Sequence, residues 1–241
     1  MSDTLRIALV SEGVTDYEFL HAAVDSMLAG RSFILKLLQP DDSIAFTGSG
    51  DAGELGGGWR GVYQWCLQAT ERNDGGIHSD PIFDAYDLLI VHLDADVAAE
   101  DPANHKTHPI PALKGILPCV KKCPPASDTT VSLRNIMLVW LGESHPPPRT
   151  VFCTPSKSLE AWLLAIFFPS DRQMIRSGWE CYPTPELRLS QQSKTVRFKK
   201  TQAEYRSRHN EIRKGWPKLA SRLSEAKRFQ DGFQRAIEPS P

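Results

Sequence analysis

Residues 88–96 read Leu-Leu-Ile-Val-His-Leu-Asp-Ala-Asp, a largely apolar run that ends in two carboxylates. A short apolar run bounded by polar residues predicts a buried strand, here over residues 88–93. Residues 5–11, Leu-Arg-Ile-Ala-Leu-Val-Ser, form a second run of this kind, and Glu12 follows it directly. Strands that are buried on both faces belong to parallel sheets covered by helices. The two runs therefore predict an α/β fold.

Outward from these two runs, predicted strands and helices alternate along the chain. Further strands are expected over residues 33–38 and 150–153. Helices are expected after an N-cap at Thr15 or Asp16, and to begin near Trp59, at Thr130 and at Ser158. This alternation predicts a largely parallel, Rossmann-like sheet flanked by helices. After residue 171 we expect helices only, interrupted at Pro183, Pro185 and Pro217.

The chain is expected to divide into two units. Residues 1–168 would form the α/β domain, with an irregular insertion at about 97–127 that is rich in proline, lysine and cysteine. Residues 169–241 would form a basic helical extension. The glycine-rich stretch 48–58 has no lysine after its glycines, so it does not match a phosphate-binding P-loop.

Charge is distributed unevenly over the 241 residues, although the formal net charge is only -1. Residues 1–170 hold 12 basic and 21 acidic residues, whereas residues 171–241 hold 16 basic and 8 acidic ones. Either the basic part binds a polyanion such as nucleic acid, or it docks on the acidic part of its own chain. The candidate phosphate contacts are Lys194, Arg197, Lys199, Lys200, Arg206, Arg208, Arg213 and Lys214. The interleaved aromatic side chains either stack on bases or form the apolar face of the helices: Phe198, Tyr205, Trp216, Phe229 and Phe233.

The sequence predicts a cytoplasmic protein. It contains no apolar run of about 18 residues that would cross a membrane, and its first residues do not have the pattern of a signal peptide. The cysteine count of five is odd, which favours free thiols. His105, His108, Cys119 and Cys123 are residue types that bind zinc, and the alternative is two loop histidines with two free thiols.

Carboxylates follow the two predicted strands where each ends. Glu12 follows the first strand, with Asp16 one helical turn later, and Asp94 and Asp96 follow the third. If the backbone stays extended, Asp94 and Asp96 share one face with His92, which either packs within the strand or orients Asp94. Ligands of parallel sheets bind beyond the carboxyl ends of the strands, and converging carboxylates there suit one or two Mg²⁺ or Mn²⁺ ions. The alternative is that these residues only form turns.

These residues resemble a known family. The segments Val-Ser-Glu-Gly-Val-Thr-Asp at 10–16 and Leu-Leu-Ile-Val-His-Leu-Asp-Ala-Asp at 88–96 look like the Toprim domain, and the first is most similar to its OLD-type (overcoming lysogenization defect) nuclease branch. The segment Ser-Lys-Ser-Leu-Glu-Ala-Trp at 156–162 is similar to a part of small stand-alone Toprim proteins in which a glutamate opens a helix beside the sheet. The resemblance covers roughly residues 5–166.

The resemblance implies a divalent-metal-dependent nuclease that acts on DNA or RNA. Metal ligands would come from Glu12, Asp16, Asp94, Asp96 and Glu160; Glu12 and Asp94 would be catalytic, and Lys157 would be the lysine near the scissile phosphate. OLD-type nucleases carry an ATPase domain that is absent here, so the resemblance implies a separate ATPase partner and a role in phage defence or in a mobile element. Two alternatives stay open: a non-catalytic Toprim-fold subunit, and small-molecule phosphate transfer or hydrolysis at the same carboxylates.

Overall fold

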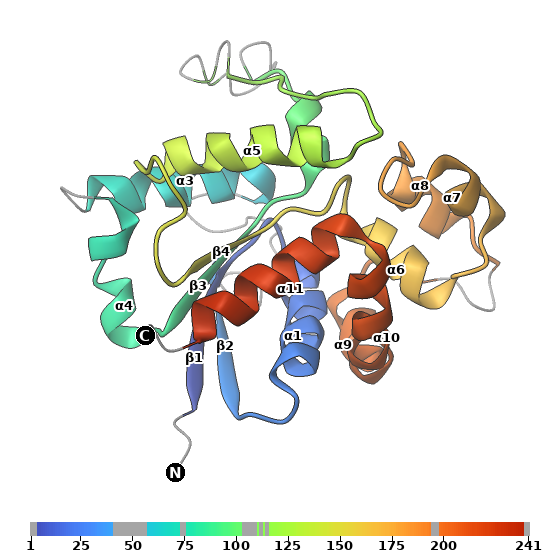
Figure 1. Cartoon of the computed structure of the whole chain (residues 1–241), viewed down its shortest axis with the longest axis horizontal. Coiled ribbons are helices and arrows are strands. Elements are labelled where there is room, and N and C mark those ends of the chain that lie inside the picture. Colours follow the sequence, from blue (N-terminus) through green and yellow to red (C-terminus); the bar gives the residue numbers. More distant parts are fainter. Residues whose placement is uncertain are drawn as a thin grey trace.

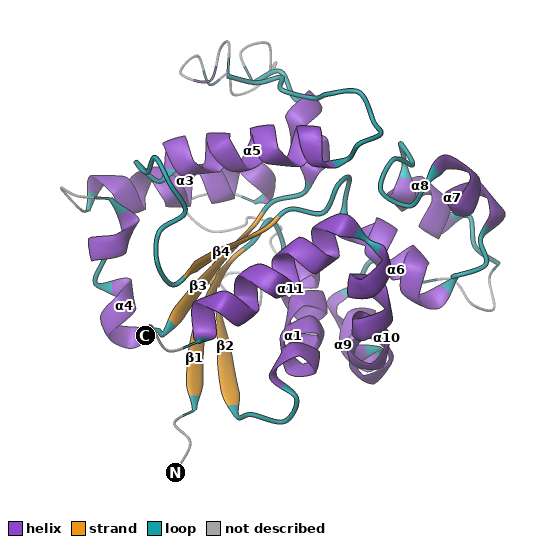
Figure 2. Cartoon of the chain, viewed as in Figure 1, coloured by secondary structure: helices purple, strands orange, loops and turns teal. Residues whose placement is uncertain are grey.

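The computed structural model describes residues 4–40, 57–72, 76–102, 110, 113, 116–193 and 198–238. Four strands form one sheet in these residues: β1 (Leu5–Val10), β2 (Phe33–Gln39), β3 (Leu88–His92) and β4 (Thr150–Cys153). All neighbouring strands are parallel, in the order β2-β1-β3-β4 (Figures 1 and 2). The predicted α/β fold with a parallel, Rossmann-like sheet is thereby confirmed.

Helices cover both faces of the sheet (Figure 1). Two of them, α3 (Gly58–Glu71) and α5 (Ser127–Trp140), lie on one face. The other face is covered by α1 (Val14–Leu28), α6 (Leu159–Phe167), α10 (His209–Arg222) and α11 (Ser224–Ile237). Shorter helices connect them: η1 (Ile77–Ser79), α4 (Ile82–Ala85), η2 (Ala95–Ala99), α7 (Arg172–Ser177), α8 (Pro185–Ser190) and α9 (Gln202–Ser207).

Both faces of the central strands are buried. This explains why residues 5–11 and 88–93 do not alternate between apolar and polar side chains. Ile7 and Leu9 of β1 pack into the cluster under α1, while Ala8 and Val10 pack into the cluster under α3 and α5. All four side chains are fully buried. Because successive side chains of a strand point to opposite faces, a strand covered on both sides must be apolar throughout.

The helices after residue 168 share the hydrophobic core of the sheet. Trp216 and Phe229, each 1% exposed, belong to the same cluster as β1 and α1. Phe233, Phe198 and Tyr205 are buried in it as well. Of the two alternatives for these aromatic residues, the structure shows the apolar helix face and excludes base stacking.

The predicted helix break at Pro217 is wrong. Helix α10 runs through Pro217 from His209 to Arg222. A proline inside a helix removes one hydrogen bond, a cost of about 3 kcal/mol. The buried neighbours Trp216 and Leu219 hold this part of the helix against the core and offset that cost. Pro185, by contrast, occupies the first position of α8, where a proline is favoured.

The expectation of free thiols throughout is also wrong. Cys123 and Cys181 form a disulfide that joins the segment before α5 to the segment after α7. Cys66, Cys119 and Cys153 are free. A cysteine in a disulfide cannot ligate zinc, so the four-ligand zinc hypothesis fails at Cys123. His105 and His108 lie outside the described residues.

None of the helices within the described ranges combines the length and the apolar character that crossing a bilayer requires.

Helix α10 packs closely against α6 at Gly215. A Cβ added to Gly215 would lie 2.7 Å from the Ile166 side chain. We expect Gly215→Ala to lower the free energy of unfolding by about 1–3 kcal/mol, because overpacking outweighs the better helix propensity of alanine. Gly232 of α11 is the matched control, since its added Cβ would meet Val151 at an ordinary 3.4 Å. Gly232→Ala should be neutral or stabilising in urea denaturation, and equal losses for both variants would contradict this account.

Candidate functional site

Carboxylates meet beyond the carboxyl ends of three neighbouring strands. Glu12 lies two residues after β1, Asp94 two residues after β3, and Glu160 in the first turn of α6, which follows β4. Asp16 lies in the first turn of α1. We call Glu12, Asp16, Asp94 and Glu160 the acidic cluster. It occupies the place where parallel sheets bind their ligands.

Main-chain amides hold two of these carboxylates. The Asp94 N–H donates to Glu12 Oε1 at 2.7 Å, and the Leu159 N–H donates to Asp94 Oδ1 at 3.1 Å. These two hydrogen bonds connect the loop after β1 to the loop after β3, and that loop to the start of α6. Asp94 is only 14% exposed. The second oxygen of each carboxylate makes no hydrogen bond within the described residues.

Asp16 is placed by the start of α1. The helix begins at Val14 with Gly13 as its N-cap, two to three residues before the predicted cap, and the Gly13 N–H donates to Asp16 Oδ2 at 2.8 Å. A first-turn carboxylate that binds the N-cap amide is one half of a capping box. The same contact turns the Asp16 side chain towards the sheet.

His92, the last residue of β3, lies between two members of the acidic cluster. Its Nδ1 is 3.8 Å from Asp16 Oδ2 and its Nε2 is 3.3 Å from Asp94 Oδ1. The ring is fully buried, and neither nitrogen has a hydrogen-bond partner of good geometry in the described part of the chain. Burial lowers the pKa of His92 against the opposing effect of Asp16. Of the two alternatives for His92, the structure shows a buried strand residue that also contacts Asp94.

Glu160 is paired with a lysine from the basic part of the chain. Lys200 Nζ lies 2.6 Å from Glu160 Oε1, and the Glu160 side chain is 4% exposed. Burial opposes the charge of Lys200, but Glu160, Asp16 and Asp94 together raise its pKa above the ordinary value. Lys157, the lysine expected near the phosphate, is half-buried, and its carbonyl accepts the Asp96 N–H at 3.0 Å.

Asp96 does not follow the predicted geometry. Strand β3 ends at His92, and Asp96 lies in the first turn of η2 rather than in an extended segment. The alternation that would place it on the face of Asp94 is therefore wrong. Its side chain reaches the surface at the rim of the acidic cluster. Desolvation, followed by the charge of Glu186, raises the pKa of Asp96 to about 6.

Burial and mutual repulsion make the acidic cluster electrostatically unfavourable. Burial, then Asp94 and Asp16, raises the pKa of Glu12 well above its usual range. Burial, then Asp16 and Glu160, does the same to the pKa of Asp94. Burial also raises the pKa of Asp16, partly offset by His92. Such a cluster gains free energy from a bound proton or cation.

A pH dependence of stability follows from these shifts. The folded protein binds protons at Glu12, Asp94 and Asp96 more tightly than the unfolded chain does, so the protonated fold is favoured. The stability contribution is present below the ordinary carboxyl pKa of about 4 and is lost as the pH rises through the raised values. Without divalent metal, the melting temperature should therefore fall as the pH rises from about 4 past about 6, the raised pKa of Asp96. Mg²⁺ should restore it at the upper pH; a metal-free protein that is more stable at the upper pH would contradict the assignment.

The donor chemistry of the acidic cluster suits Mg²⁺ or Mn²⁺, which prefer carboxylate oxygens. In Glu12, Asp16 and Asp94, one carboxylate oxygen accepts no hydrogen bond from a described main-chain group. A bound cation would reduce the repulsion among these three carboxylates. In the described part of the chain, however, no three His, Cys, Asp or Glu side chains are arranged around a common point as a metal requires. The residue types therefore suit a metal ion, and their side chains would have to turn towards a common point in order to bind one.

Several basic candidates form ion pairs with the rest of the chain. Arg206 binds Glu18 at 2.7 Å and Arg213 lies 3.4 Å from Asp25, both on α1. Arg208 pairs with its neighbours Glu204 and Glu211. Lys199 and Lys214 are exposed and make no ion pair with a described residue. Lys194 and Arg197 lie outside the described residues.

No protein-family model, curated protein or solved structure matches the chain.

Proposed function

We propose that the chain is a divalent-metal-dependent nuclease that cleaves phosphodiester bonds in DNA or RNA. The observation that supports this most is the convergence of Glu12, Asp94 and Glu160 at the ends of three adjacent parallel strands, with Asp16 beside them. The resemblance of residues 10–16 and 88–96 to the Toprim domain points to the same chemistry. A role beside a separate ATPase in phage defence rests on the resemblance alone.

In this proposal, residues of the acidic cluster bind the metal and a neighbouring histidine positions one of them. Glu12, Asp16 and Asp94 would hold one or two Mg²⁺ or Mn²⁺ ions, with Asp96 at the rim. When bound, such an ion lowers the pKa of a coordinated water and neutralises charge on a phosphate. His92, whose Nε2 lies 3.3 Å from Asp94 Oδ1, would help to orient that carboxylate.

A cavity of about 470 Å³ gives access to Glu160. Its lining includes Glu186, Lys199, Lys200 and Thr201. The two lysines would contact a phosphate as it approaches the acidic cluster. This cavity is also large enough for a small ligand, which favours small-molecule phosphate hydrolysis as the second candidate function.

Cleavage assays decide between these functions. The purified full chain is incubated with supercoiled plasmid, with structured RNA, and with a small phosphate ester, each in Mg²⁺, in Mn²⁺ and in EDTA. Metal-dependent breakage of either nucleic acid supports the nuclease. Turnover of the small ester alone would support the second candidate, and no turnover of any substrate would favour a non-catalytic subunit.

Two lysines can be compared directly. Lys200 Nζ contacts the acidic cluster through Glu160, whereas the Lys157 side chain forms no ion pair or hydrogen bond with a described residue. We expect Lys200→Met to lower metal-dependent cleavage by roughly 100-fold, the size of effect found for a charged group that stabilises a developing anion. Lys157→Met should lower it less than tenfold if Lys200 is the lysine that contacts the phosphate. The reverse order would restore Lys157 to the role that the resemblance implies.

A further inference from the structure

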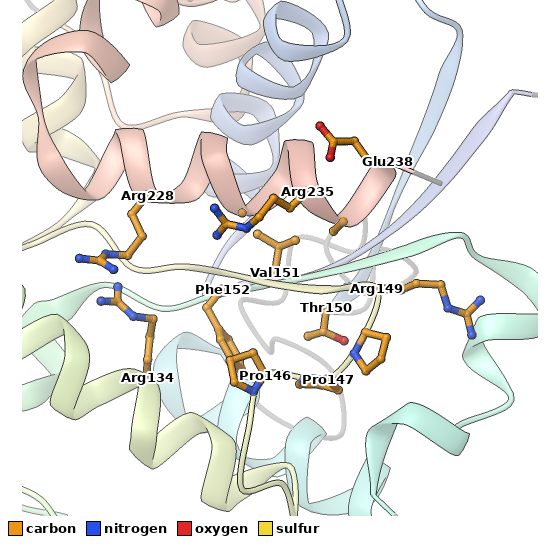
Figure 3. Close-up of a pocket in the computed structure, with 13 residues that line it drawn as sticks. Arg134, Pro146, Pro147, Arg149, Thr150, Val151, Phe152, Arg228, Arg235 and Glu238 are labelled. Atoms are coloured by element: carbon orange, nitrogen blue, oxygen red, sulfur yellow. The ribbon is translucent and has the colours of Figure 1, made fainter. Parts of the chain in front are cut away.

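A groove runs along the open edge of the sheet. Strand β4 is one of the two edge strands, and none of the described strands pairs with its outer side. The groove has a volume of about 440 Å³ and is lined by residues 150–152 of β4, by α11, by residues 146–149 and by Arg134 of α5 (Figure 3). It lies on the edge of β4 away from β1 and β2, and none of its lining residues belongs to the acidic cluster.

The backbone of β4 offers unpaired groups to this groove. The carbonyls of Arg149 and Cys153 accept hydrogen bonds from β3 and the residue after it, so alternate residues of β4 face β3. Thr150 and Phe152 therefore face the groove. The Thr150 N–H donates to the Pro147 carbonyl at 3.2 Å. This leaves the Phe152 N–H and the carbonyls of both residues on the open edge, which is the template for an added strand.

Arginine side chains surround the same groove. Figure 3 shows Arg228 and Arg235 descending from α11 on one wall and Arg134 rising from the other, with Arg149 at one end of the strand. Glu238 is the one acidic residue among the described lining residues.

Some of these arginines interact with other side chains of the chain, and the remaining one forms no ion pair with a described residue. Arg134 and Arg228 share Glu225, and Arg149 stacks on Phe83 at 4.3 Å. Arg235 is exposed and makes no ion pair with any described residue. Thr150 also lines the groove; this residue is 7% exposed, and its hydroxyl oxygen is itself buried without a hydrogen-bond partner among the described residues.

We propose that this edge groove binds an extended acidic segment of a partner protein, which adds to β4 as a fifth strand. The main-chain groups of Thr150 and Phe152 would pair with the backbone of the segment, and its carboxylates would meet Arg228 and Arg235. A second copy of this chain is disfavoured, because joining two β4 edges would bring two sets of arginines together. A nucleic-acid backbone is disfavoured, because the outward carbonyls of β4 repel phosphate and pair only with hydrogen-bond donors.

Fluorescence anisotropy with a labelled peptide tests this. The probe is a heptapeptide of alternating glutamate and valine, titrated with the full chain in EDTA. Its first control replaces glutamate with lysine, and its second carries N-methyl groups on alternate amides, which blocks strand pairing and keeps the charge. The expected result is that the glutamate–valine peptide binds, and that each control peptide binds at least about tenfold more weakly.

Variants of the chain then locate the binding. Arg235→Glu should weaken binding about tenfold or more, whereas Arg176→Glu, an exposed arginine on α7, should leave it unchanged. Phe152→Pro removes the outward N–H that an added strand would use, and Phe152→Val keeps that N–H while losing the ring. Phe152→Pro should therefore bind at least about tenfold more weakly than Phe152→Val.

Three results would overturn the proposal. Equal binding of the N-methylated peptide would show attraction by charge without strand pairing. Binding of a single-stranded oligothymidylate that is lost in Arg235→Glu, with no binding of the peptide, would make the groove a nucleic-acid surface. Absence of peptide binding would show that the prolines and arginines only protect an exposed sheet edge from aggregation.

Discussion

Replacing Asp94 with asparagine is expected to lower metal-dependent cleavage by roughly 1,000-fold. Asp94 interacts with three neighbours. Its main-chain N–H donates to Glu12, the charge of Glu160 acts on its carboxyl group, and the His92 ring contacts that carboxyl group. Asparagine keeps the oxygen that accepts the Leu159 N–H but removes the charge that would hold a cation. The measurement is the rate of plasmid or RNA cleavage in Mg²⁺ and in Mn²⁺.

The same variant carries its own control for folding. Removing one charge from a buried, repulsive cluster should leave the melting temperature in EDTA unchanged or raise it. Asp84→Asn, which removes an exposed carboxylate on α4, should alter neither cleavage nor melting. If Asp94→Asn retained full cleavage in metal, Asp94 would have no part in the reaction. The nuclease proposal would then lose its central residue.

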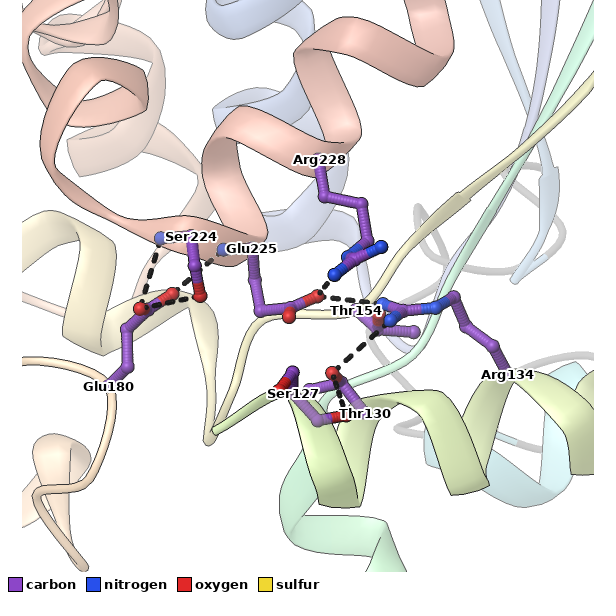
Figure 4. Close-up of polar contacts among 8 residues, drawn as sticks. All are labelled: Ser127, Thr130, Arg134, Thr154, Glu180, Ser224, Glu225 and Arg228. Atoms are coloured by element: carbon purple, nitrogen blue, oxygen red, sulfur yellow. Dashed lines mark hydrogen bonds and ion pairs between the residues drawn. The ribbon is translucent and has the colours of Figure 1, made fainter. Parts of the chain in front are cut away.

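Replacing Arg134 with methionine is expected to lower the free energy of unfolding by about 3–5 kcal/mol, a fall in melting temperature of roughly 10 °C. Arg134 donates to Glu225 Oε2 at 2.7 Å, to the Thr154 hydroxyl at 2.6 Å and to the Thr130 hydroxyl at 3.3 Å (Figure 4). Glu225 is 1% exposed. Methionine fills part of the same volume but leaves the Glu225 carboxylate buried with its nearest cation gone.

Arg228→Met is the matched control for this loss. Arg228 contacts the same Glu225 oxygen at 3.5 Å, but its side chain is 50% exposed, and exposed ion pairs contribute about 0–1 kcal/mol. Thermal and urea unfolding should therefore separate the two variants clearly. Equal, small losses would mean that Glu225 is stabilised by other groups in the folded protein. Glu225→Gln combined with Arg134→Met should recover part of the loss, because no buried charge is then left unpaired.

The sheet could be predicted from the sequence because its strands are buried on both faces. Residues 5–11 and 88–93 are apolar without alternation, a pattern that few other elements require. The positions of Glu12 and Asp94 could be predicted as well, because a residue that directly follows a parallel strand lies at the edge of the sheet where ligands bind. The alternation argument failed for Asp96, since η2 starts immediately after Asp94 and local sequence does not show where a strand stops being extended.

Contacts between distant segments could not be predicted in the same way. Lys200 reaches Glu160 from a helix-rich part of the chain, and its only sequence signal was membership of a basic run. The pairing of Cys123 with Cys181 spans 58 residues and depends on how the segments around α5 and α7 pack. Pro217 was misjudged for a related reason: local propensity favours a break, and tertiary packing of Trp216 overrides it.

The packing of α10 and α11 against the first strands sets an order of events during synthesis. A ribosome makes β1, α1 and β3 long before it makes residues 209–237, which cover the same face of the sheet. Until those residues emerge, Ile7, Leu9 and Phe19 are covered by the earlier elements alone and lack the apolar side chains of α10 and α11. A nascent chain therefore keeps part of this apolar face of the sheet exposed until these last helices have emerged.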